Sequence, residues 1–177
     1  MVITLIGYRG SGKSSVAGPL AERLGWQAVD ADIEIERKAG KSIADIFVDE
    51  GETRFRELER QVMKQLLAGD RTIIAAGGGA ILNYETRRQM KAAGPVVWLT
   101  APVDVLTQRI GHDESTASRR PNLTATGGTA EIERVLADRE PLYRECATVI
   151  VDSSQQSPGE LVEEILTAIG PLAGKDG

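Results

Sequence analysis

Near its start this 177-residue chain reads Gly7-Tyr8-Arg9-Gly10-Ser11-Gly12-Lys13-Ser14, which matches the pattern G-x-x-x-x-G-K-[ST] at every required position. The apolar run Val2–Ile6 precedes it and a helix-like segment follows it. Glycines at these positions let the backbone wrap a phosphate, with N–H groups pointing inward from the loop and the helix start. Spacing, the Lys-Ser pair and both flanks therefore favour a phosphate-binding P-loop over a glycine turn that merely joins strand to helix.

Two side chains of this loop have expected tasks. Lys13 would reach the β- and γ-phosphates of a nucleoside triphosphate, and Ser14 would place its hydroxyl on Mg²⁺. The loop predicts ATP-type phosphate binding, but it does not identify the group that receives the phosphate.

Apolar runs alternate with amphipathic segments along the whole chain, which predicts a parallel sheet covered by helices on both sides. Strands are expected at residues 2–6, 27–29, 72–76, 96–99 and 148–151. Helices are expected at residues 13–24, 33–38, 52–67, 85–93, 103–110, 130–144 and 159–169, with a further short helix capped by Ser42.

The length fits one domain, which we place at residues 1–172, with a flexible tail at 173–177. Residues 111–128 are polar and aperiodic, so we expect a mobile lid there. A net charge of −5 argues against nucleic acid as a partner. The single cysteine, Cys146, excludes an intrachain disulfide and suits a reducing cytoplasm, and the sequence shows no membrane segment.

Asp30 and Asp32 stand at the carboxyl end of the second predicted strand, the edge where ligands bind in open parallel sheets. Two carboxylates at this spacing splay apart, so one could hold water on Mg²⁺ while the other accepts a hydrogen bond from an acceptor hydroxyl. Capping of the next helix by one Asp is an equally good interpretation, and the two roles can coexist.

Arg56 and Glu59 are three residues apart on the long predicted helix, so Glu59 could hold the guanidinium in place for a ligand carboxylate. A solvated ion pair is the commoner outcome for such a pair. Gly77, Gly78 and Gly79 follow the third strand; a tight turn needs only one or two glycines, so we favour a ligand lying against bare backbone.

Two further arginines follow in the second half. Arg120, in Arg119-Arg120-Pro121, would close over the phosphates from the lid, although incidental solvated arginines are a real alternative. Arg139 would face the same ligand, or would instead interact with the C-terminus of its helix.

Taken together, these pieces resemble the shikimate kinase family from Val2 to about Asp152. The matching pieces are Gly7–Ser14, Asp30-Ala31-Asp32 with Ile35-Glu36, Gly40-Lys41-Ser42-Ile43, Ile46-Phe47, Gly51-Glu52, Phe55-Arg56 with Glu59, Gly77–Gly79, Arg120-Pro121 and Arg139–Tyr143. The resemblance implies a three-layer α/β/α fold of the nucleoside monophosphate kinase-like type, with a five-stranded parallel sheet. It also implies transfer of the γ-phosphoryl group of MgATP to the 3-hydroxyl of shikimate, a step of aromatic amino acid biosynthesis. We expect a monomer, although no motif in the sequence determines the oligomeric state.

The resemblance also implies residue roles. Asp32 would bind the reacting hydroxyl and act as its base, and Asp30 would approach Mg²⁺ through water. Arg56 and Arg139 would clamp the shikimate carboxylate, beside the glycine run. The implied ATP-binding residues are Gly10, Ser11, Gly12, Lys13, Ser14, Ser15, Arg109, which would flank the adenine, and Arg120 on the lid.

The chain departs from the family pattern at three places. Ala75-Ala76 stands where a Ser or Thr often precedes the glycines, Asn122 follows Pro121 in place of Leu, and residues 153–156 lack an arginine near adenine. A gluconate kinase-like enzyme and a non-catalytic nucleotide-binding regulator remain the alternatives. A GTPase is disfavoured because the chain has no Asn-Lys-x-Asp motif.

Overall fold

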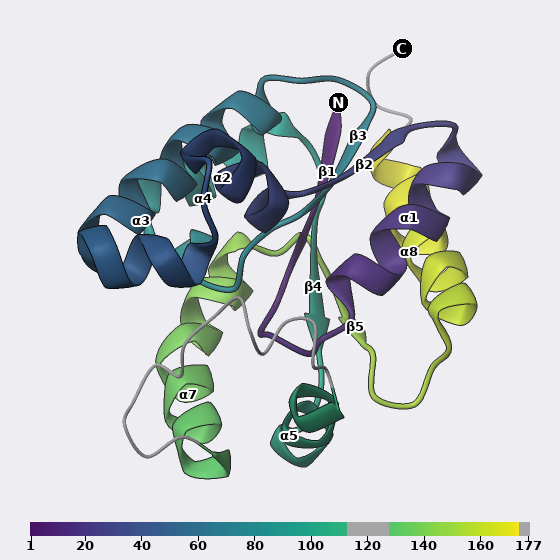
Figure 1. Cartoon of the computed structure of the whole chain (residues 1–177). Helices are drawn as coiled ribbons and strands as arrows, with labels where there is room; N and C mark the ends of the chain where they lie inside the picture. The colour runs from purple at the N-terminus through teal and green to yellow at the C-terminus, as the bar shows by residue number, and fades with distance from the viewer. Residues whose placement is uncertain (113–127, 174–177) are drawn as a thin grey trace.

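A computed structural model of the protein describes residues 1–112 and 128–173. Within these ranges the strands form one five-stranded sheet with the order β2-β3-β1-β4-β5 (Figure 1). The strands are β1 (Val2–Ile6), β2 (Gln27–Asp30), β3 (Thr72–Ala75), β4 (Val96–Thr100) and β5 (Val149–Asp152). All neighbouring strands run parallel, which confirms the predicted sheet.

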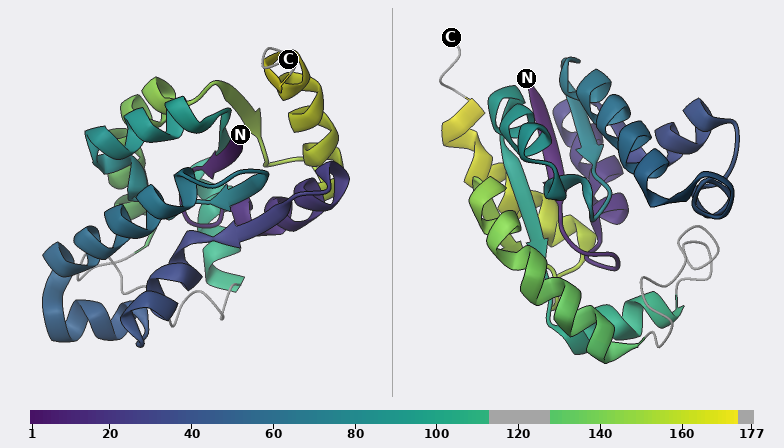
Figure 2. Two further views of the ribbon diagram at one scale, coloured as in Figure 1. Left: turned by 90° about the horizontal axis from the view of Figure 1, so that it is seen from above. Right: turned by 90° about the vertical axis from the view of Figure 1, so that its left-hand side faces the viewer.

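Helices cover both faces of this sheet, as Figures 1 and 2 show. Their bounds are α1 (Lys13–Leu24), α2 (Ala31–Ala39), α3 (Ile43–Leu67), η1 (Ala80–Leu82), α4 (Tyr84–Ala93), α5 (Val103–His112), α7 (Thr129–Cys146) and α8 (Pro158–Ala173). Successive residues of β1 point to opposite faces. Ile3 and Leu5 therefore pack against α1 and α8, whereas Val2 and Ile6 pack toward α3, α4 and α7.

Helices α2 and α3 have a small apolar core of their own, which includes Ile35, Ile46 and Phe55. The Ser42 hydroxyl accepts a hydrogen bond from the backbone N–H of Asp45 at 3.1 Å, so the predicted cap of α3 is formed. Gly51 has φ 79° and ψ 174° and breaks the helical geometry inside α3. The two helices predicted here are therefore joined end to end at a glycine kink.

Some boundaries differ from those predicted. The short helix η1, directly after the glycine run, was not predicted. Helix α5 continues through His112, so the first two residues of the predicted lid are helical, and α8 continues through Ala173. Most of the lid prediction, including Arg120 and Asn122, lies outside the described residues. Within the described ranges, no helix combines the length and apolar character needed to cross a membrane.

Thr4 gives a test of the core. It lies in the middle of β1, is fully buried, and its hydroxyl has no hydrogen-bond partner among the described residues. A buried hydroxyl without a partner is unfavourable, so Thr4→Val, which keeps the shape, is expected to raise the free energy of unfolding by about 1 kcal/mol. Urea unfolding measures this change, and a lower midpoint for Thr4→Val would contradict it.

Candidate active site

A cavity of about 700 Å³ lies at the carboxyl ends of β1, β2 and β3. Its lining includes the P-loop residues from Arg9 to Ser15, apart from Ser11, and the carboxylates Asp30 and Asp32. Gly77 and Gly78 line it from the end of β3. Because parallel strands end at one edge, three segments far apart in the sequence meet around one space.

The P-loop has the backbone geometry that phosphate binding requires. Gly7 has φ 145°, and a methyl group on it would lie 2.5 Å from the carbonyl oxygen of Leu99, so only glycine fits. Gly12, with φ 91°, is the N-cap residue of α1, and no described side chain caps this helix end. The free backbone N–H groups at the start of α1 and the positive end of its dipole therefore face the place where an anion would bind.

Lys13 lies along the inside of the loop. Its Nζ donates hydrogen bonds to the carbonyl oxygens of Gly7 at 3.0 Å and Tyr8 at 2.9 Å. These contacts place the ammonium group at the centre of the loop, beside the N-terminus of α1. Burial raises the pKa of the Tyr8 phenol, so this side chain of the loop stays neutral at physiological pH.

Asp30 caps the following helix, which was one of the two roles predicted for it, and its other carboxylate oxygen contacts the phosphate loop. Its Oδ1 accepts a hydrogen bond from the backbone N–H of Asp32 at 2.9 Å and so caps α2. Its Oδ2 accepts a hydrogen bond from the hydroxyl of Ser14, also at 2.9 Å. One carboxylate thus connects the second strand to the P-loop. Asp32 is half-buried and lines the same cavity.

Arg56 is held by two carboxylates of α3. The nearly buried Glu59 accepts a hydrogen bond from Nη1 at 2.7 Å, as the spacing predicted. The exposed Glu52 accepts from Nε and Nη2, both at 3.3 Å. The Nε–Nη2 edge is a fork that can grip a carboxylate with two parallel hydrogen bonds. Glu59 therefore fixes the guanidinium, and the edge next to Glu52 faces solvent.

The glycine run brings Arg56 and Arg139 together. Nη1 of Arg139 donates to the carbonyl oxygen of Gly78 at 3.2 Å, and the hydroxyl of Tyr143 donates to the same oxygen at 2.7 Å. The guanidinium of Arg56 lies directly against Gly79, where a methyl group would come within 2.8 Å of its Cζ. Helices α3 and α7 thus each place an arginine beside neighbouring glycines.

Arg109 lines the cavity and is held in place by Ser153. Its Nη1 donates to the hydroxyl of Ser153 at 3.1 Å and its Nη2 to the Ser153 carbonyl oxygen at 2.6 Å. Pro158 and Leu161 add apolar surface on this side. A guanidinium beside apolar side chains suits a flat heteroaromatic base. Ala75 and Ala76 line the cavity beside Asp30 and contribute methyl groups but no hydroxyl.

The predicted residues separate into two adjoining groups. The phosphate loop, Asp30, Asp32 and Arg109 line one cavity, whereas Arg56 and Arg139 are not among its lining residues and meet next to it at Gly78–Gly79. No role was predicted for Tyr143, although Arg139-Glu140-Pro141-Leu142-Tyr143 was identified as one motif. Its spacing of four residues from Arg139 puts both side chains on one face of the helix, which was the available signal for a shared site, but the bond to Gly78 depends on how α7 packs.

Comparison with known proteins gives a consistent result. The family model described as shikimate kinase matches residues 9–170. A shikimate kinase of Rhodopirellula baltica is 43% identical over 171 residues, covering 97% of this chain and 91% of that protein. A shikimate kinase of Microcystis aeruginosa is 42% identical over 174 residues, covering 98% of this chain and 88% of that protein.

Solved structures agree with the sequence comparison. The shikimate kinase from Acinetobacter baumannii in complex with shikimate has a TM-score of 0.89 and 37% identity, covering 99% of this chain and 95% of that chain. The Aquifex aeolicus shikimate kinase has a TM-score of 0.80 and 34% identity, with 98% of each chain covered. A gluconokinase from Sinorhizobium meliloti has a TM-score of 0.57 at 19% identity over 97% of this chain and 93% of that one, and this likeness shows the fold alone.

Gly79 tests the geometry of the arginine pair. Its φ of −100° and ψ of −3° suit any residue, so Gly79→Ala meets no backbone strain, but the new methyl group must displace Arg56. We expect the KM for the acceptor to rise at least about tenfold, with the KM for ATP nearly unchanged.

The matched control is Gly18→Ala in α1, where a methyl group meets no atom within 4 Å. Steady-state kinetics with each substrate varied in turn make the comparison. Wild-type acceptor kinetics in Gly79→Ala would show that the Arg56 position is unimportant.

Proposed function

The chain belongs to the shikimate kinase family, and from this premise we propose how its residues carry out the transfer of a phosphoryl group from ATP to the 3-hydroxyl of shikimate. The observation that carries the proposal is the meeting of Arg56 and Arg139 at Gly78–Gly79, beside the phosphate loop. Two planar cationic forks at one place suit a single carboxylate on a small ligand.

The carboxylate of shikimate would lie between Arg56 and Arg139. Glu52 is exposed and its contacts to Arg56 are long, so the substrate carboxylate would take over the Nε–Nη2 edge. Glu59 would keep its short bond to Nη1 and hold the group in position. The backbone of Gly77, Gly78 and Gly79 would contact the ring hydroxyls, because no side chain separates it from the ligand.

ATP would occupy the cavity with its phosphates in the P-loop. Gly10, Ser11, Gly12, Ser14 and Ser15 would surround the phosphates, while Lys13 would exchange its carbonyl contacts for β- and γ-phosphate oxygens. Arg109 would flank the adenine, beside Pro158 and Leu161. Arg120, which lies outside the described residues, would add positive charge from the lid.

The chemical step needs few groups from the protein. The 3-hydroxyl oxygen forms a bond to the γ-phosphorus as the bond from that phosphorus to the β,γ-bridging oxygen breaks, which releases ADP. Asp32 would accept the proton of the hydroxyl, and Lys13 would stabilise charge on the transferring group. Most of the acceleration would come from holding acceptor and donor in line within the closed site.

Ser14 and Asp30 fit a magnesium site. A hydroxyl and a carboxylate 2.9 Å apart at the phosphate loop are hard oxygen donors, and Mg²⁺ commonly keeps several waters and adds phosphate oxygens. Ser14 would bind the ion directly and Asp30 through water. When bound there, Mg²⁺ would neutralise the negative charge that develops on the phosphates during transfer. We also propose that the enzyme acts as a monomer in the cytoplasm, where its single buried thiol would stay reduced.

An assay of ADP formation with shikimate, quinate or gluconate as the acceptor tests the assignment. Shikimate is expected to give by far the highest kcat/KM. A preference for gluconate would favour a gluconate kinase-like enzyme. ATP binding without turnover of any acceptor would favour a nucleotide-binding regulator, in which Ala75-Ala76 had removed a hydroxyl near the metal.

Arg56→Ala tests the carboxylate clamp. Loss of two charge-assisted hydrogen bonds is expected to weaken shikimate binding about 100-fold and to leave the Kd for ATP nearly unchanged. The control is Arg54→Ala on the same helix, a half-buried arginine paired with Glu50 and Glu57. Calorimetric titration with each ligand makes the measurement, and equal loss of both affinities in Arg56→Ala would count against the clamp.

Asp30→Asn tests the metal site separately from the helix cap. Asn caps a helix as well as Asp does, so the thermal midpoint should not change, whereas the Mg²⁺ concentration for half-maximal activity should rise about fivefold or more. Asp30→Ala should show the same Mg²⁺ effect plus a loss of about 1 kcal/mol of stability. An unchanged Mg²⁺ requirement in both variants would limit Asp30 to capping.

A further inference from the structure

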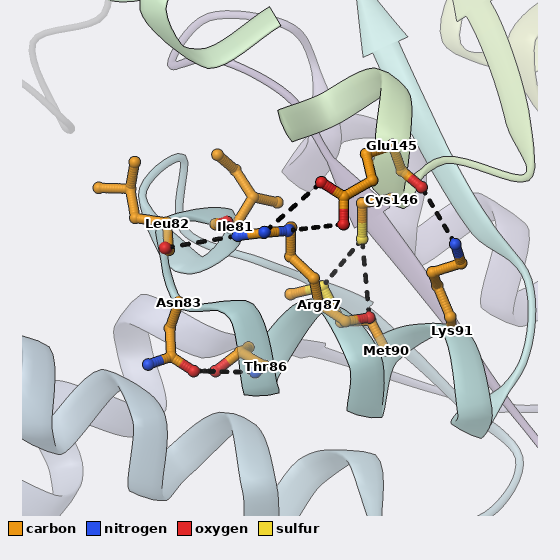
Figure 3. A network of polar contacts seen from close by, with 9 residues as sticks. All are labelled: Ile81, Leu82, Asn83, Thr86, Arg87, Met90, Lys91, Glu145 and Cys146. Atoms are coloured by element: carbon orange, nitrogen blue, oxygen red, sulfur yellow. Dashed lines mark hydrogen bonds and ion pairs between the residues drawn. The ribbon is translucent and has the colours of Figure 1, made fainter. Parts of the chain in front are cut away.

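Arg87 is a buried charged residue that the proposed mechanism leaves without a task. It lies on α4, is 8% exposed, and its guanidinium is inserted between two other elements (Figure 3). Nη1 donates to the carbonyl oxygens of Ile81 at 2.7 Å and Leu82 at 3.4 Å, at the end of η1. Nε and Nη2 donate to the two carboxylate oxygens of Glu145 at 3.4 and 3.5 Å, near the end of α7.

Both elements that Arg87 joins are directly connected to the arginine clamp. Helix η1 begins directly after Gly79, which lies against the guanidinium of Arg56. Helix α7 carries Arg139, which donates to Gly78. Each of the two elements therefore continues into one half of the carboxylate site, and Arg87 connects them away from the ligand.

The contacts of Arg87 attach α7 to the segment after the glycine run at a second point. Tyr143 and Arg139 already bond α7 to the carbonyl oxygen of Gly78. Buried Tyr143 and Cys146 hold this end of α7 by apolar packing, and the contact at Glu145 adds a second polar attachment that restrains the separation and angle of α7 relative to η1. Lys91 strengthens the same end of α7 by donating to the Glu145 carbonyl oxygen at 3.2 Å.

We propose that Arg87 is a positioning residue that sets the separation of Arg139 from Gly78–Gly79 and Arg56, and through it the affinity for the acceptor's carboxylate. The inference rests on the proposed function, because it takes the two arginines as the carboxylate clamp. Arg87 contacts no part of the phosphate loop among its described hydrogen bonds and ion pairs, so its effect falls on the acceptor side of the reaction.

Arg87→Met removes all four hydrogen bonds and keeps much of the side-chain volume. The KM for shikimate is expected to rise about tenfold, with the KM for ATP within about twofold of wild type. Glu145→Gln keeps the bonds from Arg87 to η1 but loses the charge pairing, and a rise of about threefold is expected. The control is Arg88→Met, the next residue, which is exposed and pairs only with Glu85 among the described residues.

Cys146 provides a readout of packing in the same place. It is the single cysteine, it is fully buried, and its Sγ lies 3.9 Å from the Arg87 carbonyl oxygen. Burial raises the pKa of its thiol to about 11, so an aromatic disulfide reagent should react with it only after local opening. A labelling rate like that of wild type shows that α4 still packs against α7.

A double variant separates positioning from a general structural role. If Arg87 acts through Arg139, the shikimate KM of the double variant Arg87→Met with Arg139→Ala should be little higher than that of Arg139→Ala alone.

Two results would overturn the proposal. One is that the two substitutions have additive effects on the free energy derived from the shikimate KM. The other is a wild-type shikimate KM in Arg87→Met while Cys146 is still protected. If Arg87→Met does not fold, a wild-type shikimate KM in Glu145→Gln would also overturn it. Absence of shikimate-dependent ADP formation in the wild-type protein would instead reject the proposed function.

Discussion

The absence of a side chain at Gly79 is the constraint on which the rest of the site depends. Arg56 can lie against the chain at Gly79 only because no methyl group occupies that space. The carbonyl oxygen of the neighbouring Gly78 accepts hydrogen bonds from Arg139 and Tyr143. Helices separated by about half of the chain are thereby held against the same few backbone atoms, and a methyl group on Gly79 would displace Arg56 from them.

The sheet topology sets the distance from this site to the phosphate loop. Strands β1 and β3 are neighbours in the sheet, so the loops that leave their carboxyl ends lie side by side. A methyl group on Gly78 would be only 3.4 Å from the carbonyl oxygen of Gly7, which begins the P-loop. An acceptor lying on the glycine run is therefore next to the terminal phosphate without any large movement of the sheet.

Much of this arrangement could be predicted from the sequence, because it depends on local rules. The P-loop, the five strands and the Arg56–Glu59 pair each follow from spacing within a few residues. The short helix η1, the Tyr143–Gly78 bond and the Arg87–Glu145 pair could not be predicted. Each depends on how a segment packs against residues that are far from it in the sequence. Local hydrophobic periodicity does not reveal these partners. Arg87 in particular looks like an ordinary exposed helical arginine until α7 is placed beside it.

The electrostatics of the site are local, and the surrounding carboxylates are not equivalent. A chain with net charge −5 attracts two anionic substrates only if cations are concentrated where they bind. The two glutamates on Arg56 differ in a way that allows this. Glu59 has 5% of its side chain exposed and a 2.7 Å contact, so water cannot easily replace it. Glu52 has 63% exposed and a 3.3 Å contact, so hydration compensates its release. One carboxylate can therefore orient the guanidinium, while the other would yield its place to an anion bound as proposed.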